Sequence, residues 1–129
     1  MPLQVNITKK EENVFTVSCF GSIDQTTHTF LEKEVGKILF PSTKVIIFDM
    51  GGVNYVSSMG IGVILKTKKS LEQNKGMLIM TNLQPQVKTV FDIIKALPNE
   101  AIFSSIEEAD AYLDEIQKKE IEKRQSFDL

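Results

Sequence analysis

The sequence predicts an α/β domain in which helices pack against a mostly parallel sheet. Short segments with period-two alternation or continuous apolar runs, typical of strands, are followed by segments with helical spacing. The order is strand–strand–helix and then three further strand–helix pairs, and the strand–helix–strand crossovers imply parallel pairing with right-handed connections. We therefore expect a five-stranded, mostly parallel sheet with an antiparallel edge strand, and about four helices.

Composition limits the size and the class of the protein. A chain of 129 residues is one domain by length, and 42% hydrophobic with 25% charged residues is typical of a globular protein. The net charge of −2 gives no support to nucleic-acid binding, and no apolar run approaches the length of a membrane span. The N-terminus lacks the apolar region of a signal peptide, and the single cysteine excludes an intrachain disulfide, so we expect a cytoplasmic protein.

The first two strands are predicted to form a hairpin. Apolar and polar residues alternate over 3–7 and again over 15–19, and a polar turn at 11–13 separates the two segments. Cys19 falls on the apolar phase of the second strand, which predicts a buried thiol that behaves as a small hydrophobe.

A helix is predicted after the hairpin. Gly21 is expected to end the second strand, and helical spacing extends from Asp24 or Thr26 to about Leu39. His28, the only histidine, lies in the first turn of this helix. A metal site here would need carboxylates for most of its ligands, so we expect a solvated histidine and no metal.

The centre of the chain combines a buried strand with a tight loop. Residues 45–48 form a continuous run of β-branched and aromatic side chains, as in a strand that is buried on both faces. Asp49 is expected to end this strand, and Gly51 and Gly52 favour a turn. A short apolar segment with Asn54 in its middle then leads to the next helix.

Two serines open the second helix. Ser57 and Ser58 are both good helix N-caps, and simple capping accounts for either of them when only the local sequence is considered. The helix runs to about Asn74 despite Gly60 and Gly62, each of which costs about 1 kcal/mol in a helix. These glycines predict either close backbone packing or room for a large partner beside a serine at the positive end of a helix dipole.

The last part of the chain predicts two more strand–helix pairs. We expect a short buried strand over 77–80, a helix with Pro85 near its start, and a fifth strand over 101–103. Two overlapping capping boxes then open a last helix, and the charged residues 116–129 form a helix extension or a mobile tail beyond a folded domain of residues 1–115. The side chains expected on the buried face of this last helix are Ile106, Ala109, Tyr112, Leu113 and Ile116.

Residues 57–63, Ser-Ser-Met-Gly-Ile-Gly-Val, resemble the signature of STAS domains. The resemblance is to the bacterial anti-sigma factor antagonists, in which Asp-Ser-Ser/Thr-Gly-Leu-Gly-Val opens a helix after a strand that ends in Asp. Phe-Gly-Ser-Ile-Asp at 20–24 and Leu-Gln-Pro-Gln-Val at 83–87 match two further stretches of the family. The resemblance extends from about Leu3 to Leu113 and implies a STAS-like fold.

The resemblance implies a partner switch that is controlled at Ser58. In this family the unphosphorylated antagonist binds an anti-sigma factor that is also a Ser/Thr kinase, phosphorylation of the serine separates the two proteins, and a phosphatase resets the switch. No cofactor is implied, and we expect a monomer or a weak dimer. The residues implied to surround Ser58 or to contact the partner are Asp24, Asp49, Gly51, Gly52, Asn54, Ser57, Met59 and Gly60.

Two other functions stay open at this point. Ser57 stands where the family usually has Asp, and Met59 stands where it usually has Ser or Thr. The alternative function is therefore a STAS module that serves a transporter or scaffold complex and is not phosphorylated. A hydrolase would need a Gly-x-Ser-x-Gly elbow and a nearby histidine. Val56 takes the place of the first glycine and the sole histidine lies in another helix, so we expect no enzymatic activity.

Overall fold

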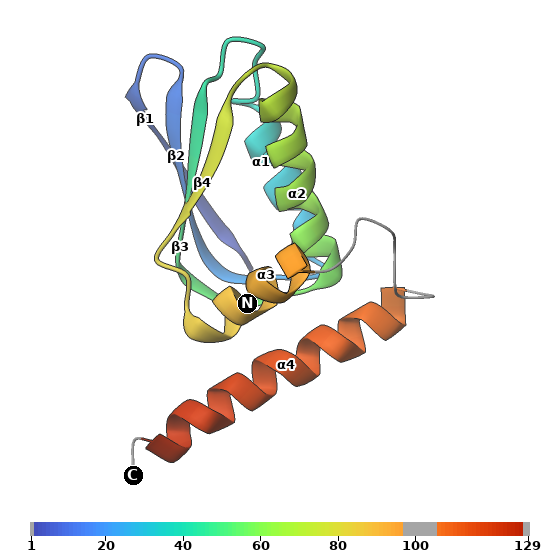
Figure 1. Ribbon diagram of the computed structural model, residues 1–129. Helices are drawn as coiled ribbons and strands as arrows, with labels where there is room; N and C mark the ends of the chain where they lie inside the picture. Colours follow the sequence, from blue (N-terminus) through green and yellow to red (C-terminus); the bar gives the residue numbers. More distant parts are fainter. Residues whose placement is uncertain (1, 97–105, 128–129) are drawn as a thin grey trace.

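Four strands form one sheet in the order β1-β2-β3-β4 in the computed structural model, which describes residues 2–96 and 106–127 (Figure 1). β1 pairs with β2 in antiparallel fashion, whereas the β2–β3 and β3–β4 pairs are parallel, so the mostly parallel sheet with an antiparallel edge strand is confirmed. The fifth strand expected over 101–103 lies outside the described residues. The strands are β1 (Gln4–Glu11), β2 (Val14–Ile23), β3 (Val45–Val56) and β4 (Met77–Thr81).

Four helices accompany the sheet: α1 (His28–Gly36), α2 (Ser58–Gln73), α3 (Pro85–Ala96) and α4 (Ile106–Phe127). Figure 1 shows α1 and α2 against one face of the sheet, whereas α3 and α4 lie at its lower end, where the parallel strands finish. The order of the elements and the α/β class agree with the prediction. The helices therefore cover one sheet face and the carboxyl ends of the strands.

The core lies between the sheet and the helices α1 and α2. In β3, Ile46, Phe48 and Met50 are fully buried, whereas the alternating residues Val45 and Ile47 are partly exposed. The expectation of a strand buried on both faces is therefore wrong. A run of apolar side chains does not distinguish one covered face from two, and in the described part of the chain the helices cover only one.

β3 does not turn at its glycine pair. The strand continues through Gly51 and Gly52 to Val56, and neither glycine has a positive φ. Gly52 is instead required by close packing, because a Cβ atom there would lie 2.3 Å from Cδ1 of Phe20 and 2.8 Å from the backbone oxygen of Cys19. The predicted turn was wrong because a glycine pair signals either a turn or a close approach of two strands.

The connection from β2 to α1 is longer than the sequence suggested. Gly21 does not end β2: it adopts a φ of +115° within the strand, which continues to Ile23. The Asp24 carboxylate then accepts hydrogen bonds from the backbone N–H groups of Thr26 (2.9 Å) and Thr27 (3.2 Å). This turn delays the start of α1 to His28.

β4 differs from expectation, and so does the exposure of Tyr112 in the last helix, whereas the helix extension was one of the two alternatives for the end of the chain. β4 is an edge of the described sheet, with Met77 53% and Ile79 38% exposed, so it is not a buried strand. α4 continues through the charged segment to Phe127, and its Leu113 is buried as expected, whereas Tyr112 is 43% exposed. Ile116 is partly buried against the core, and the side chains of the first four residues of α4 lie outside the described part.

Cys19 is a buried free thiol, as the alternation predicted. Burial, with a smaller contribution from the negative charge of Asp49, raises its pKa from 9.0 to about 12. We expect a thiol reagent to label Cys19 at neutral pH only when the chain unfolds, because the reactive thiolate is suppressed in the folded state. The folded pKa lies above the unfolded one, so stability that depends on the neutral thiol is complete below pH 9 and falls as the pH rises toward 12. Labelling of Cys19, followed by mass spectrometry along a denaturant titration, tests whether the folded chain protects the thiol. Rapid labelling of the folded chain would contradict this protection.

Candidate functional site

The two serines at the start of α2 have different roles. Ser57 is the N-cap: its side chain is buried and accepts the backbone N–H of Gly60 at 3.2 Å. Ser58 is the first residue of the helix and is half-buried. Its hydroxyl donates to the Asp110 carboxylate at 2.7 Å, and its backbone N–H donates to the same oxygen at 2.9 Å. Capping of α2 therefore does not require the Ser58 hydroxyl.

The carboxylate that contacts Ser58 comes from the last helix. Asp110 lies in α4, and its second oxygen accepts a hydrogen bond from the Gln25 side chain at 3.3 Å. The first backbone N–H groups of a helix have no partner within the helix, and the helix dipole favours an anion at that end. Asp110, which lies 52 residues after Ser58 in the chain, thus acts as an anionic ligand for the N-terminus of α2.

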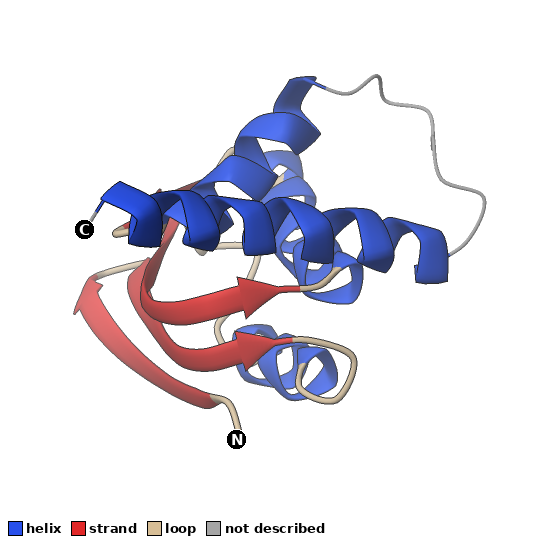
Figure 2. Cartoon of the chain, turned by 90° about the horizontal axis from the view of Figure 1, so that it is seen from below, coloured by secondary structure: helices blue, strands red, loops and turns tan. Residues whose placement is uncertain are grey.

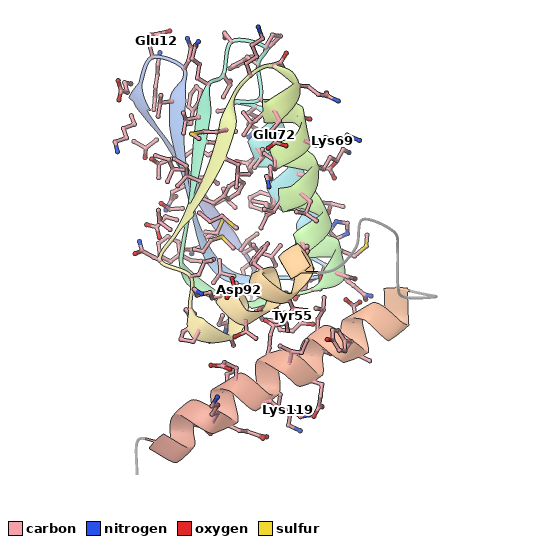
Figure 3. The ribbon with its side chains drawn as sticks, in the orientation of Figure 1. Glu12, Tyr55, Lys69, Glu72, Asp92 and Lys119 are labelled. Carbon is pink, nitrogen blue, oxygen red and sulfur yellow. The ribbon has the colours of Figure 1, made fainter. Side chains whose placement is uncertain are left out.

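Two further side chains of α4 bind the end of β3. Gln117 is buried, donates to the backbone oxygen of Val56 at 2.9 Å and accepts the Val56 N–H at 3.1 Å. The Tyr55 hydroxyl donates to Asp114. Figure 2 shows α4 lying across the ends of the strands, and Figure 3 shows Tyr55 between the end of β3 and α4. The helix is thereby joined to both residues that precede the serine pair.

A hollow of about 420 Å³ opens beside the serine pair, and its charges are acidic. No lysine or arginine is among its described lining residues. Partial burial opposes ionisation of Asp24, but the hydrogen bonds from Thr26 and Thr27 outweigh it and lower the pKa of that carboxyl. Burial, the hydrogen bond to Asp114 and nearby aspartate charges raise the pKa of Tyr55, so it stays a neutral donor. The hollow is lined by Asp24, Gln25, Thr26, Tyr55, Ser57, Asp110 and Asp114.

The two glycines of α2 serve different purposes. Gly60 is buried, and a Cβ atom there would lie 2.6 Å from Cγ2 and 2.7 Å from the backbone oxygen of Ile23. Gly62 is exposed, and a Cβ atom would have nothing within 4 Å. Gly62 lines a second, smaller hollow together with Ser58 and Met59. Close backbone packing therefore explains Gly60, and room beside the serine is provided at Gly62.

The structure does not bring every predicted residue to Ser58. Asp49, Gly51 and Gly52 lie earlier in β3, between about 13 Å (Gly52) and about 23 Å (Asp49) along the strand from its end at Val56, at about 3.3 Å per residue. The Asp49 carboxylate accepts hydrogen bonds from the Asn82 side chain and the Gly51 N–H, both at 3.1 Å. It therefore does not orient the Ser58 hydroxyl.

Asn54 occupies an intermediate position. Its side chain accepts a hydrogen bond from the Ser22 hydroxyl at 3.0 Å, and it lines a hollow shared with Tyr55 and Gln117. This places Asn54 at the margin of the surface around Ser58, whereas Asp24 lies in the adjoining acidic hollow.

Sequence reasoning missed the side chains from α4 that contact the serine and the end of β3. Asp110, Asp114 and Gln117 are spaced four and three residues apart, which places them on one face of a helix. Leu113, on the same side, is buried. The signal was a polar stripe on the face of α4 that turns toward the fold.

The described residues contain neither a metal-binding cluster nor a helix suited to cross a membrane. Residues 2–96 and 106–127 contain no group of three or more His, Cys, Asp or Glu side chains arranged to hold a metal ion. Among these same residues, no helix combines the length and apolar character of a membrane span.

Comparison with known proteins connects this geometry to a family. The family model of the STAS domain matches residues 6–109. The putative anti-sigma factor antagonist BtrV of Bordetella bronchiseptica is 28% identical over 90 residues, which cover 69% of this chain and 78% of BtrV.

Solved structures share the fold. The unphosphorylated anti-sigma factor antagonist SpoIIAA aligns with a TM-score of 0.61 at 19% identity, over 86% of this chain and 98% of its own. The phosphorylated form of SpoIIAA, from Bacillus, aligns with a TM-score of 0.61 at 20% identity, over 70% of this chain and 83% of its own. The murine anion transporter Slc26a9 gives 0.59 at 21% identity, over 79% of this chain but only 18% of the transporter. The family match spans most of the chain, and with the fold it shows that this protein belongs to the STAS domain family.

Proposed function

We propose that the chain is an anti-sigma factor antagonist that switches partners through Ser58. With Ser58 unmodified it binds an anti-sigma factor that is also a Ser/Thr kinase, and phosphorylation by that kinase separates the two proteins until a phosphatase removes the phosphate. The chain is a regulator rather than an enzyme, as its relatives are antagonists that act on other proteins. We place this function in the cytoplasm, where sigma factors act.

The position of the Ser58 hydroxyl is the observation that carries this proposal. Ser57 performs the capping, so the hydroxyl of Ser58 is not needed to start α2. It is half-buried at the carboxyl ends of the parallel strands, which is where open α/β sheets place their functional sites. A structural relative, SpoIIAA, exists in both phosphorylated and unphosphorylated forms.

Phosphate at this position would leave the sheet and α2 folded and would act on the surface around Ser58. It adds about −1.5 to −2 charge at pH 7, and the N-terminus of α2 is favourable for an anion. A partner that covers Ser58 would have to bury that charge beside an acidic hollow. The proposed partner surface centres on Ser58 and Met59, with Asp24 and Asn54 at its margin.

Kinase treatment followed by intact-mass measurement tests the proposal. Incubation with the cognate kinase and ATP should add one phosphate to the wild-type chain and to Ser57→Ala, and none to Ser58→Ala. The Ser57 variant is the matched control because it removes the neighbouring hydroxyl and a cap worth about 1 kcal/mol without touching the acceptor. Equal phosphorylation of the wild type and Ser58→Ala would show that the kinase modifies a residue other than Ser58.

A STAS module of a transporter or scaffold complex is the second candidate. Two observations favour this candidate. The fold of the chain is similar to part of the transporter Slc26a9, and Ser57 and Met59 differ from the usual family motif. This function needs no phosphorylation. It is preferred if no candidate kinase modifies Ser58 while the folded chain binds a transporter or scaffold protein.

A further inference from the structure

The surface around Ser58 already has an occupant, which is the chain's own last helix. Asp110 binds both the hydroxyl and the backbone N–H of Ser58, and Gln117 binds both backbone groups of Val56. A kinase must reach the Ser58 hydroxyl, and a partner that senses this serine must cover it. Neither can do so while Asp110 remains in place.

Among its described side chains, α4 is held to this surface by polar groups and by a small apolar contact. In α2, the buried residues include Ile61, Val63, Ile64 and Leu71, which anchor that helix in the core. Among the described side chains of α4, Leu113 and Gln117 are the fully buried ones, and Ile116 is partly buried. Polar bonds are replaceable by water or by a partner, so each contributes only modestly to the net stability of the docked helix. The contact therefore suits an exchangeable occupant better than a core helix.

A negative charge introduced at Ser58 would act directly on α4. An oxygen of Asp110 lies 2.7 Å from the Ser58 hydroxyl oxygen, and Asp114 and Asp24 line the same hollow. A phosphate on Ser58 would compete with Asp110 for the N-terminus of α2 and would repel its carboxylate. No described lysine or arginine lines this acidic hollow. Lys66 lines the other hollow beside Ser58, but it is already paired with Glu32 at 2.7 Å.

We propose that α4 is an internal competitor for the Ser58 surface, and that a negative charge on Ser58 displaces it. Docked α4 reduces access of both kinase and partner to the unmodified serine, because only the undocked fraction is competent to bind. The identity of those competitors rests on the proposed function. The displacement by charge rests only on the contacts between α4 and the start of α2.

Hydrogen exchange of the full-length chain tests the displacement without any partner. The comparison is between Ser58→Glu and Ser58→Gln, which have nearly the same shape and differ in charge. We expect the amides of α4 to exchange at least tenfold faster in the Glu variant than in the Gln variant, while those of β3 stay protected in both. Protection of β3 shows that the fold is intact.

A second substitution shows whether Asp110 is the group that senses the charge. Adding Asp110→Asn to Ser58→Glu removes the repulsion but keeps a side chain of the same size, so protection of α4 should recover. Equal exchange of α4 in the Glu and Gln variants, or no recovery in the double variant, would overturn the inference.

The competition is measured separately on the unmodified serine. Gln117→Ala removes both bonds to Val56, and it should raise the rate of phosphorylation and the partner affinity about tenfold, whereas the exposed Lys119→Ala should change neither. No gain in Gln117→Ala would overturn the competitor role. If no kinase modifies Ser58 but Ser58→Glu still releases α4, the proposed function fails and the displacement by charge stands. If a kinase modifies Ser58 but Ser58→Glu does not release α4, the displacement alone is refuted.

Discussion

Replacing Gly60 by alanine is expected to destabilise the domain by about 1–3 kcal/mol, as overpacking of a close-packed contact does. The new Cβ atom would meet the side chain of Ile23 at 2.6 Å and its backbone oxygen at 2.7 Å. A backbone oxygen in the adjoining strand cannot move aside without disturbing the sheet. The loss should therefore exceed the roughly 1 kcal/mol that alanine gains over glycine from helix propensity.

Gly62→Ala is the matched control for this prediction. It makes the same change two residues along the same helix, where the Cβ atom would have nothing within 4 Å. We expect it to stabilise the domain by about 0.5–1 kcal/mol. Denaturant titration of the two variants and the wild type measures both effects. Changes of the same sign would show that the helix does not pack on β2 as described, and would favour the other role that the sequence left open for Gly60, which is room for a partner.

A charge at position 58 is expected to have the largest effect on binding. An unpaired charge buried at an interface costs on the order of 2–5 kcal/mol, which corresponds to roughly thirtyfold to several-thousandfold in affinity. Ser58→Ala should bind the anti-sigma partner whether or not kinase and ATP are present, whereas Ser58→Glu should bind poorly. The thermal midpoint of Ser58→Ala should stay close to that of the wild type, because Ser57 still caps α2. For Ser58→Glu, protection of the β3 amides from hydrogen exchange shows that the sheet is still folded.

Titration calorimetry with the purified partner measures these affinities. Ser58→Gln separates the effect of charge from that of size. If Ser58→Glu binds as tightly as Ser58→Ala at equal stability, the partner switch is wrong and the unphosphorylated STAS module becomes the better description.

The order of the elements could be predicted because it depends on local patterns. Period-two alternation identified the β1–β2 hairpin, and helical spacing identified α2 and its start at the serine pair. The parallel pairing of β2, β3 and β4 then followed from the crossover connections. These inferences need only neighbouring residues and general rules of chain topology.

The inferences that failed depend on contacts between distant segments. Gly52 packs against β2 instead of marking a turn. For Gly60 the sequence left close packing and an open surface as alternatives, and only its contact with Ile23 decides between them. Asp110 reaches Ser58 only because α4 crosses the ends of the strands. A single sequence contains the spacing of Asp110, Asp114 and Gln117 but not the docking of their helix.

The most direct test of the account is partner affinity for one preparation of the wild-type chain in both phosphorylation states. The chain is phosphorylated to completion with its cognate kinase, measured against the partner, then dephosphorylated and measured again. We expect a loss of at least about thirtyfold on phosphorylation and full recovery once the phosphate is removed, corresponding to about 2 kcal/mol or more. Equal affinity in the two states, with the mass confirming one phosphate on Ser58, would contradict the account.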